Sequence, residues 1–408
     1  MTHPLVPFLL LVLTAGAASV VSAAPPAEPK LFDPSGRVLT RLHRSLRLTD
    51  RGAGQTRVLQ FGASHTAADL FTGYLRHRLQ ERFGDAGHGY VMPVVPWRGY
   101  RHTDVVFESS GEWRTDRAFG GESADDGFYG LAGFACSTSS CDARAQLGTA
   151  PRSRFGAKVS RFEVFFLKQP GGGSFDVFID EGHYDRISTR GTEPEAGYSE
   201  IRVPDGPHTL EIRPRGDGEV RLFGVVMERS APGVVVDTLG INGARASVWL
   251  KWDEAIWRSQ VRRRAADLVV LAYGTNETGD DHEPIGRYTQ NLRAVLERLK
   301  SAAPDAACVL VGPTDRPVEV KRGRKKVFVE RPRTADIIRA QKLAAREFGC
   351  GFFDLVDAMG GPGSMVRWVK QGLAQKDHVH LTARGYSVLS ERFVNALLDG
   401  YEPRSAAR

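Results

Sequence analysis

Four short segments of the sequence carry the residue types that ester hydrolysis needs. They are Gly62-Ala63-Ser64, residues 240–244, Gly274-Thr275-Asn276 and residues 377–380. A serine hydroxyl becomes a nucleophile when a histidine takes its proton, and the histidine needs an acceptor on its other ring nitrogen. Asp377 and His380 are three residues apart and can meet across one turn, although Asp377 could instead cap a helix. We expect Ser64, His380 and Asp377 to form a catalytic triad.

The same segments supply donors for the oxyanion that forms during acyl transfer. The backbone N–H groups of Ser64 and Gly243 and the side-chain amide of Asn276 could provide three such donors. Each residue also has a simpler interpretation, as a helix cap for Ser64 and as turn residues for Gly243 and Asn276. His65 and His378 adjoin the named residues and are not expected to be catalytic. The order of the segments along the chain favours catalysis over these separate roles.

The surrounding sequence predicts an α/β unit that positions these residues. A short apolar strand at residues 57–62 leads into a helix at residues 67–83. Later strands are expected at residues 233–237, 267–272, 307–311 and 351–355, and helices at residues 245–260, 285–300, 334–348 and 382–399. This alternation predicts a parallel sheet with right-handed crossovers. Three of the four segments then lie at the carboxyl ends of strands, where α/β sheets bind their ligands.

A β-rich block interrupts the α/β unit. Residues 98–230 form short runs that mostly alternate apolar and polar residues, separated by Gly, Pro or Asp turns and without helical segments. This pattern predicts an inserted all-β sandwich. The hydrolase domain would then comprise residues 24–97 and 231–408.

The N-terminal region reads as an export signal. An apolar run at residues 5–24 ends in small residues, and Val21-Ser22-Ala23 fits a signal-peptidase site. An uncleaved membrane anchor is the alternative, but Pro7 and Gly16 interrupt the run. We therefore expect residues 1–23 to be a signal peptide and the protein to be periplasmic or secreted. No other stretch is long and apolar enough to span a membrane.

The charge of the chain is moderately basic. The formal net charge of +7 among 408 residues favours acidic polymers or anionic surfaces as partners. A basic run at residues 319–333 is expected to be a solvated loop, with a dedicated anion site as the alternative.

The four cysteines leave the disulfide pattern open. Cys136 and Cys141 bracket a polar loop and could close a small ring, whereas Cys308 and Cys350 lie in or beside apolar strands and could be buried as small hydrophobic residues. None has metal-ligand spacing with histidine, so no metal site is predicted.

Taken together, the four segments resemble the SGNH (GDSL-like) hydrolases, a family named for its Ser, Gly, Asn and His blocks. The matching residues are Ser64, Gly243, Asn276 and His380, with Asp377 completing the Asp-x-x-His block. The resemblance implies a flavodoxin-like three-layer α/β fold that hydrolyses or transfers acyl groups. Two positions depart from the family pattern: Ala63 and Glu277 stand where aspartate is common.

A wider stretch is similar to the exported peptidoglycan O-acetylesterases within that family. The similarity rests on residues 62–91, the β-rich insertion, and the segments GINGARA, AYGTNE and DHVHLTARGY. These esterases remove acetyl groups from muramic acid and carry a carbohydrate-binding-like sandwich. The resemblance implies an O-acetylated glycan as partner, without cofactor or nucleic acid, and with membrane contact only through an uncleaved N-terminal segment. An O-acetyltransferase acting on a surface polysaccharide and a non-catalytic glycan-binding protein remain as alternatives.

Overall fold

The strands of the α/β unit form one parallel sheet in the computed structural model, which describes residues 28–120 and 123–403. Its order is β13 (Gly233–Gly240), β1 (Gln55–Gly62), β14 (Leu268–Ala272), β15 (Ala307–Val311) and β18 (Gly351–Phe353). Numbered by their sequence within this sheet, the strands run 2-1-3-4-5, which is the flavodoxin-like order. The predicted α/β fold is therefore confirmed. The predicted signal peptide, residues 1–23, lies outside the described residues.

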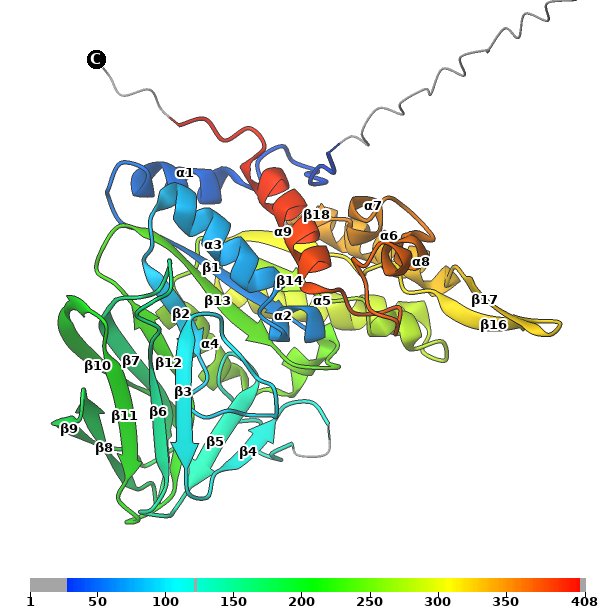
Figure 1. Cartoon of the computed structure of the whole chain (residues 1–408). Coiled ribbons are helices and arrows are strands. Elements are labelled where there is room, and N and C mark those ends of the chain that lie inside the picture. Colours follow the sequence, from blue (N-terminus) through cyan, green and yellow to red (C-terminus); the bar gives the residue numbers. More distant parts are fainter. Residues whose placement is uncertain (1–27, 121–122, 404–408) are drawn as a thin grey trace, which may run out of the picture.

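Helices cover both faces of this sheet (Figure 1). One layer contains α1 (Thr40–Thr49), α3 (Phe71–Phe83) and α9 (Ala383–Leu398), and the other contains α4 (Glu254–Arg264), α5 (Ile285–Ala302) and α6 (Pro332–Phe348). Successive residues of β14 face opposite layers: Val270 packs in the core with the first set, and Leu271 packs with the second. This two-sided burial explains why the strand is a continuous apolar run.

Several short elements complete the α/β unit. They are α2 (Ser64–Ala67), the 3-10 helices η1 (Ala246–Lys251) and η2 (Glu277–Gly279), α7 (Leu355–Ala358) and α8 (Ser364–Lys370). The helix predicted at residues 67–83 corresponds to α3, which begins at Phe71. The preceding α2 is a separate short helix, and Asp69 between the two has φ +50°. No helix within residues 28–120 and 123–403 combines the length and apolar character that crossing a membrane requires.

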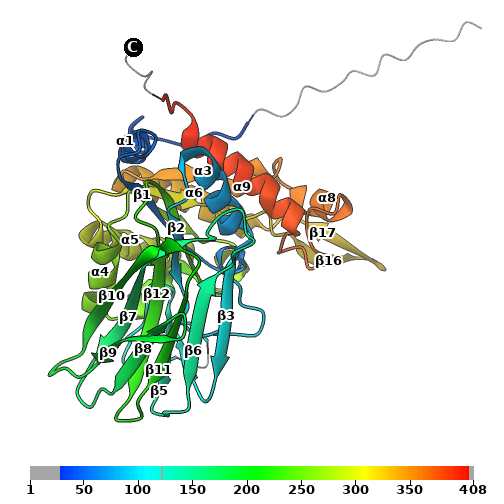
Figure 2. The ribbon, with the colours of Figure 1, turned by 60° about the vertical axis from the view of Figure 1, so that its left-hand side comes forward.

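Two antiparallel sheets form the inserted β domain (Figure 2). The first has the order β10 (Glu195–Gly206), β7 (Val159–Lys168), β12 (Val220–Glu228), β5 (Phe134–Thr138) and β4 (Arg114–Arg117), with β2 (Gly87–Val91) also paired to β12. The second has the order β3 (Val105–Ser110), β6 (Arg144–Thr149), β11 (Thr209–Pro214), β8 (Ser174–Ile179) and β9 (Gly182–Ser188). Because β2 precedes residue 98, the chain segment before the insert contributes a strand to one sheet of the sandwich.

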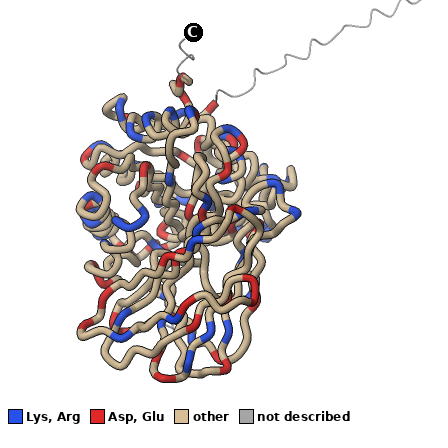
Figure 3. The backbone as a smooth tube through the Cα atoms, turned by 90° about the vertical axis from the view of Figure 1, so that its left-hand side faces the viewer, with Lys and Arg blue, Asp and Glu red and all other residues tan. Residues whose placement is uncertain are grey.

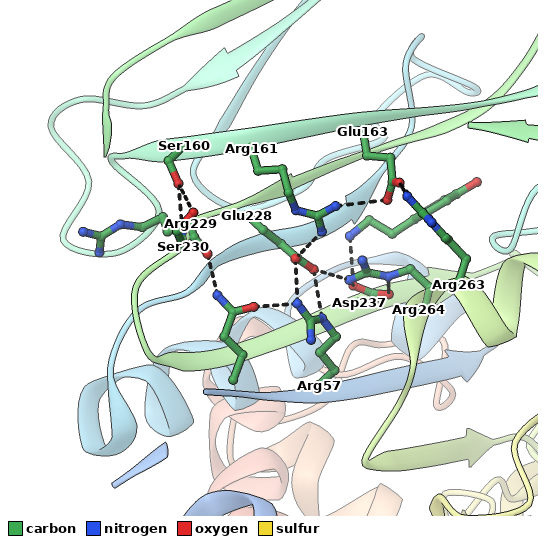
Figure 4. Close-up of polar contacts among 12 residues, drawn as sticks. Arg57, Ser160, Arg161, Glu163, Glu228, Arg229, Ser230, Asp237, Arg263 and Arg264 are labelled. Carbon is green, nitrogen blue, oxygen red and sulfur yellow. Dashed lines mark hydrogen bonds and ion pairs between the residues drawn. The ribbon is translucent and has the colours of Figure 1, made fainter. Parts of the chain in front are cut away.

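A buried charge cluster joins the sandwich to the parallel sheet (Figure 4). Arg264 of α4 donates to Asp237 of β13 and to Glu228 of β12, with N–O distances of 2.7 Å to each carboxylate. Arg57 of β1 and Arg161 of β7 also bind Glu228. Burial opposes ionisation of Glu228, but the three guanidinium groups outweigh it and hold its pKa below the ordinary value. The residues of this cluster are therefore charged, and their ion pairs link the sandwich to the parallel sheet.

The basic run at residues 319–333 is not a loop, contrary to the sequence-based expectation. It contains a two-stranded hairpin, β16 (Val318–Arg322) and β17 (Lys325–Val329), which projects from the end of the α/β unit opposite α1 (Figures 1 and 2).

The structure forms one disulfide from the four cysteines, whose pairing the sequence left open. Cys308 and Cys350 form a disulfide, with their Cα atoms 4.6 Å apart, whereas Cys136 and Cys141 are free thiols. Val309 pairs with Gly351 in the sheet, so the register of β15 and β18 brings the preceding cysteines together.

Candidate active site

The turn between β1 and α2 places Ser64 at the carboxyl edge of the sheet. Gly62 ends the strand, and a Cβ atom there would lie 2.2 Å from the Thr66 hydroxyl oxygen and 2.9 Å from the Ala272 carbonyl oxygen. Only glycine permits this approach, which allows the chain to turn directly into α2 at Ser64. The N–H of Ser64 belongs to the first helical turn and so has no acceptor within the helix.

The three residues of the predicted triad meet at this edge. The Nε2 atom of His380 lies 3.0 Å from Ser64 Oγ, and its Nδ1 atom lies 2.6 Å from Asp377 Oδ2. The other oxygen of Asp377 accepts from the backbone N–H groups of Val379 and His380, at 3.0 Å each. These bonds fix the loop before α9 and orient the imidazole so that Nε2 can accept the serine proton.

The electrostatics of this arrangement suit a charged orienting group. Burial tends to raise the pKa of Asp377, but the hydrogen bonds from His380 and from two backbone amides outweigh it and leave the pKa lowered. Asp377 is therefore a carboxylate at neutral pH and stabilises an imidazolium on His380. The His380 side chain is 38% exposed, so the base is accessible from solvent.

The two predicted oxyanion-hole residues other than Ser64 come from neighbouring loops. Asn276 donates its side-chain amide to the Ala244 carbonyl oxygen at 2.9 Å, which links the loop after β14 to the loop after β13. Gly243 has φ +76°, a conformation that glycine adopts without strain. The adjacent N–H of Ile241 donates to the Gly62 carbonyl oxygen at 3.0 Å, which holds this loop against the serine turn. The oxyanion role of these donors stays a prediction.

Glu277 links two loops of the site, and sequence analysis did not identify it as a site residue. Its buried carboxylate accepts from the N–H of Gly274 at 3.0 Å and from the N–H of Ala246 at 2.9 Å. Burial raises its pKa, while those two amides and Arg245 oppose the rise. The carboxylate thus spans the two loops that carry Asn276 and Gly243. Its position directly after Asn276 was the one available signal, and it appeared only as a departure from the family pattern.

The insert reaches the same loops. A Cβ atom on Gly243 would lie 3.0 Å from the Phe119 ring, which follows β4 of the sandwich. The Arg245 guanidinium lies 5.8 Å from the centre of that ring. The wall of the site beside Gly243 is therefore built partly by the inserted domain.

His65 packs behind the triad. Its Nδ1 atom lies 2.8 Å from the Tyr386 hydroxyl, and its ring centre lies 5.6 Å from that of His380. Burial and the neighbouring His380 lower the pKa of His65 to about 3. It is therefore neutral at pH 7, so it supports His380 without adding positive charge beside it.

A metal centre is not evident in the part of the chain that the structure describes. No group of three or more His, Cys, Asp or Glu side chains there could hold a metal ion.

A family of known proteins matches the C-terminal part of the chain. Residues 209–388 match the GDSL-like lipase/acylhydrolase family, a range that contains Gly243, Asn276, Asp377 and His380. Ser64 lies outside that range, on the other side of most of the insert. No curated protein matches the chain.

Solved structures extend the match to nearly the whole chain. A structure described as a peptidoglycan O-acetylesterase in action has 27% identity and a TM-score of 0.75, and covers 92% of this chain and 99% of its own. An active-site mutant of a family two carbohydrate esterase from Clostridium thermocellum has 10% identity and a TM-score of 0.32, covering 72% of this chain and 100% of its own. A salicylyl-acyltransferase from a tetracycline biosynthetic pathway has 14% identity and a TM-score of 0.35, covering 77% and 98%.

The Ser64 turn, the order of the parallel sheet and the family match at residues 209–388 all indicate the same fold. Residues 209–388 form a GDSL-like lipase/acylhydrolase domain within an α/β fold of the SGNH type, and the protein is an esterase.

Proposed function

We propose that the protein removes O-acetyl groups from a cell-wall glycan, namely the 6-O-acetyl groups of muramic acid in peptidoglycan. The observation that carries the proposal is the hydrogen-bonded series Ser64–His380–Asp377 at the open edge of the sheet. The similarity over 92% of the chain to a peptidoglycan O-acetylesterase supports the choice of substrate.

The reaction proceeds in two acyl transfers. Ser64 Oγ attacks the acetyl carbonyl carbon while His380 Nε2 takes the hydroxyl proton. The oxyanion accepts hydrogen bonds from the N–H groups of Ser64 and Gly243 and from the Asn276 amide. The C–O bond to the sugar then breaks, and His380 returns the proton to the sugar oxygen. Water, deprotonated by His380, then attacks the carbonyl carbon of the acetyl-serine. The bond from that carbon to Ser64 Oγ breaks, His380 returns the proton to Oγ, and acetate leaves.

The decisive assay measures free acetate released from O-acetylated peptidoglycan. Ser64→Ala and His380→Ala should each remove most of the turnover, and the double variant should be little worse because the residues act as a unit. Asp377→Asn should be damaging but should retain more activity. His282→Ala, which changes an exposed histidine outside the triad, is the matched control. Full activity in Ser64→Ala would refute the mechanism, and an inactive wild-type protein that binds the glycan would be a binding protein instead.

Whether water or a sugar hydroxyl accepts the acetyl group needs a separate measurement, since the triad and the oxyanion hole serve hydrolysis and transfer equally. The wild-type protein is given an acetylated and a de-acetylated glycan together, and both acetate and newly acetylated sugar are quantified. We expect acetate to dominate. Faster acetylation of the second glycan would identify an O-acetyltransferase.

Export is part of the proposal because peptidoglycan lies outside the cytoplasm. The mature protein should begin near Ala24, which N-terminal sequencing of the secreted or periplasmic protein would establish. An intact N-terminus on a soluble cytoplasmic protein would contradict this proposal.

A further inference from the structure

The β16–β17 hairpin concentrates unpaired positive charge at its tip. Residues 321–326, with the sequence KRGRKK, are all exposed and contain five basic residues. On the sandwich strands, in contrast, acidic and basic residues are interspersed (Figure 3). Among the described residues, this tip makes one ion pair, between Lys326 and Glu319 at 2.7 Å.

The strand register increases this repulsion. Lys321 lies opposite Lys326, and Arg322 lies opposite Lys325. Like charges that face each other across antiparallel strands destabilise the pairing. A two-stranded hairpin has little stability of its own in water. The tip therefore stands in a conformation that a negatively charged partner would stabilise.

The base of the hairpin lies against the catalytic loop. The Phe328 ring stacks on His378 with ring centres 3.8 Å apart, and His378 directly follows Asp377. Arg324 at the turn is four positions before Phe328, which corresponds to about 13 Å along a strand. The positive charge thus lies beside the active site but displaced from the reacting bond.

We propose that this tip binds carboxylates carried by the same polymer that presents the acetyl ester to Ser64. The inference rests on the proposed function and adds a recognition element to it. A glycan with short acidic peptides along its length carries carboxylates at some distance from its acetyl ester, whereas a small ester carries none. The tip then helps to bind the polymer, whereas the triad cleaves the acetyl ester bond.

The test compares two triple variants that each remove three positive charges. One is Arg322→Gln/Arg324→Gln/Lys325→Gln at the tip. The matched control is Arg37→Gln/Arg44→Gln/Arg51→Gln, around α1 at the opposite end, where these three arginines are exposed. Within the described chain, none of these six side chains makes an ion pair. The readouts are kcat/KM for acetate release from O-acetylated peptidoglycan and for p-nitrophenyl acetate.

We expect the tip variant to lose roughly five- to thirtyfold in kcat/KM on the polymer, from the usual strength of exposed ion pairs, and to keep full activity on p-nitrophenyl acetate. The control variant should match wild type on both substrates. Raising the salt to about 0.5 M should remove most of the difference between wild type and the tip variant. Peptidoglycan whose carboxylates have been converted to amides should be hydrolysed equally by both proteins.

Other outcomes overturn the inference. Equal losses on both substrates would mean that the hairpin supports the catalytic loop instead of binding polymer. A tip variant that loses binding to phosphatidylglycerol vesicles but not activity on peptidoglycan would assign the tip to an anionic membrane. If wild-type protein releases no acetate from peptidoglycan, the proposed function fails first; if it does and the tip variant equals it, the hairpin proposal alone fails.

Discussion

Asn276 donates one side-chain amide hydrogen to the Ala244 carbonyl oxygen, at 2.9 Å. The amide nitrogen carries a second hydrogen, which leaves one donor for an oxyanion. Asn276→Ala should therefore lower kcat by about a hundred- to a thousandfold, the usual effect of losing one such donor. KM should change little, because the donor acts on charge that develops in the transition state. Steady-state kinetics with p-nitrophenyl acetate would measure this, and a change in KM alone would restrict Asn276 to substrate binding.

Glu277→Gln should also lower kcat, through misplacement of the oxyanion donors. Glutamine offers one carbonyl oxygen, so one of the N–H groups of Gly274 and Ala246 would face an amide NH2 and lose its acceptor. An unsatisfied buried donor costs about 1–3 kcal/mol, which urea unfolding would detect. Glu277→Asp restores the charge with a shorter reach, and should recover part of kcat. Reduced stability with an unchanged kcat would make Glu277 a purely structural residue.

The stability of the protein should fall between about pH 6.5 and pH 4. Burial lowers the pKa of His65 and His102 to about 3 and that of His88 to about 4, from an ordinary value of 6.5. In this window the unfolded chain binds protons that the folded histidines do not, so acid favours unfolding. Each histidine contributes up to about 1.4 kcal/mol per pH unit. The buried carboxylates Asp69 and Glu228 have lowered pKa values, so their stabilisation is lost only at lower pH.

One variant isolates part of this effect. His88 bonds the Gly156 carbonyl oxygen through Nε2 at 2.8 Å, and His88→Gln keeps a donor without a titrating ring. The free energy of unfolding, measured in urea at pH 7, 6 and 5, should decline less steeply in this variant. An identical decline would assign the acid sensitivity to other groups.

The Cys308–Cys350 disulfide should stabilise the sheet without affecting the chemistry. It closes a loop of 42 residues, for which the loss of chain entropy in the unfolded state typically contributes 2–4 kcal/mol. Cys308→Ala/Cys350→Ala should unfold at lower urea concentration and retain its kcat at 25 °C. Cys136→Ala, which removes a buried free thiol, is the control for losing sulfur from the core. If the double variant proves no less stable than wild type, the bond contributes nothing to stability.

Sequence patterns predicted the sheet well because its strands are buried on both sides. Residues 268–272 and 307–311 are unbroken apolar runs between amphipathic helices, and the structure has strands at both. The predicted triad residues also meet, since each follows or adjoins a recognisable element. The sequence analysis did not predict the helix α1, because few of its ten residues are apolar, although the buried Leu42 and Leu46 lie one helical turn apart.

The features that sequence did not predict depend on contacts between distant residues. The hairpin has like charges across its strands, so local preference opposes it, and its Phe328 packs on His378 from a separate loop. The disulfide follows from the register of β15 against β18, which spacing along the chain does not reveal. Glu277 acts by holding an amide in another loop, at Ala246.

The buried charge cluster limits how this architecture can be recombined. Glu228 belongs to the sandwich, while Arg264 and Asp237 belong to the hydrolase unit, and all three are almost wholly inaccessible to solvent. A chimaera that receives a sandwich with a neutral residue in place of Glu228 would bury part of a guanidinium charge without its counter-ion, a defect that usually costs about 3–5 kcal/mol. An exchange of the sandwich would therefore have to transfer the acid and the base together.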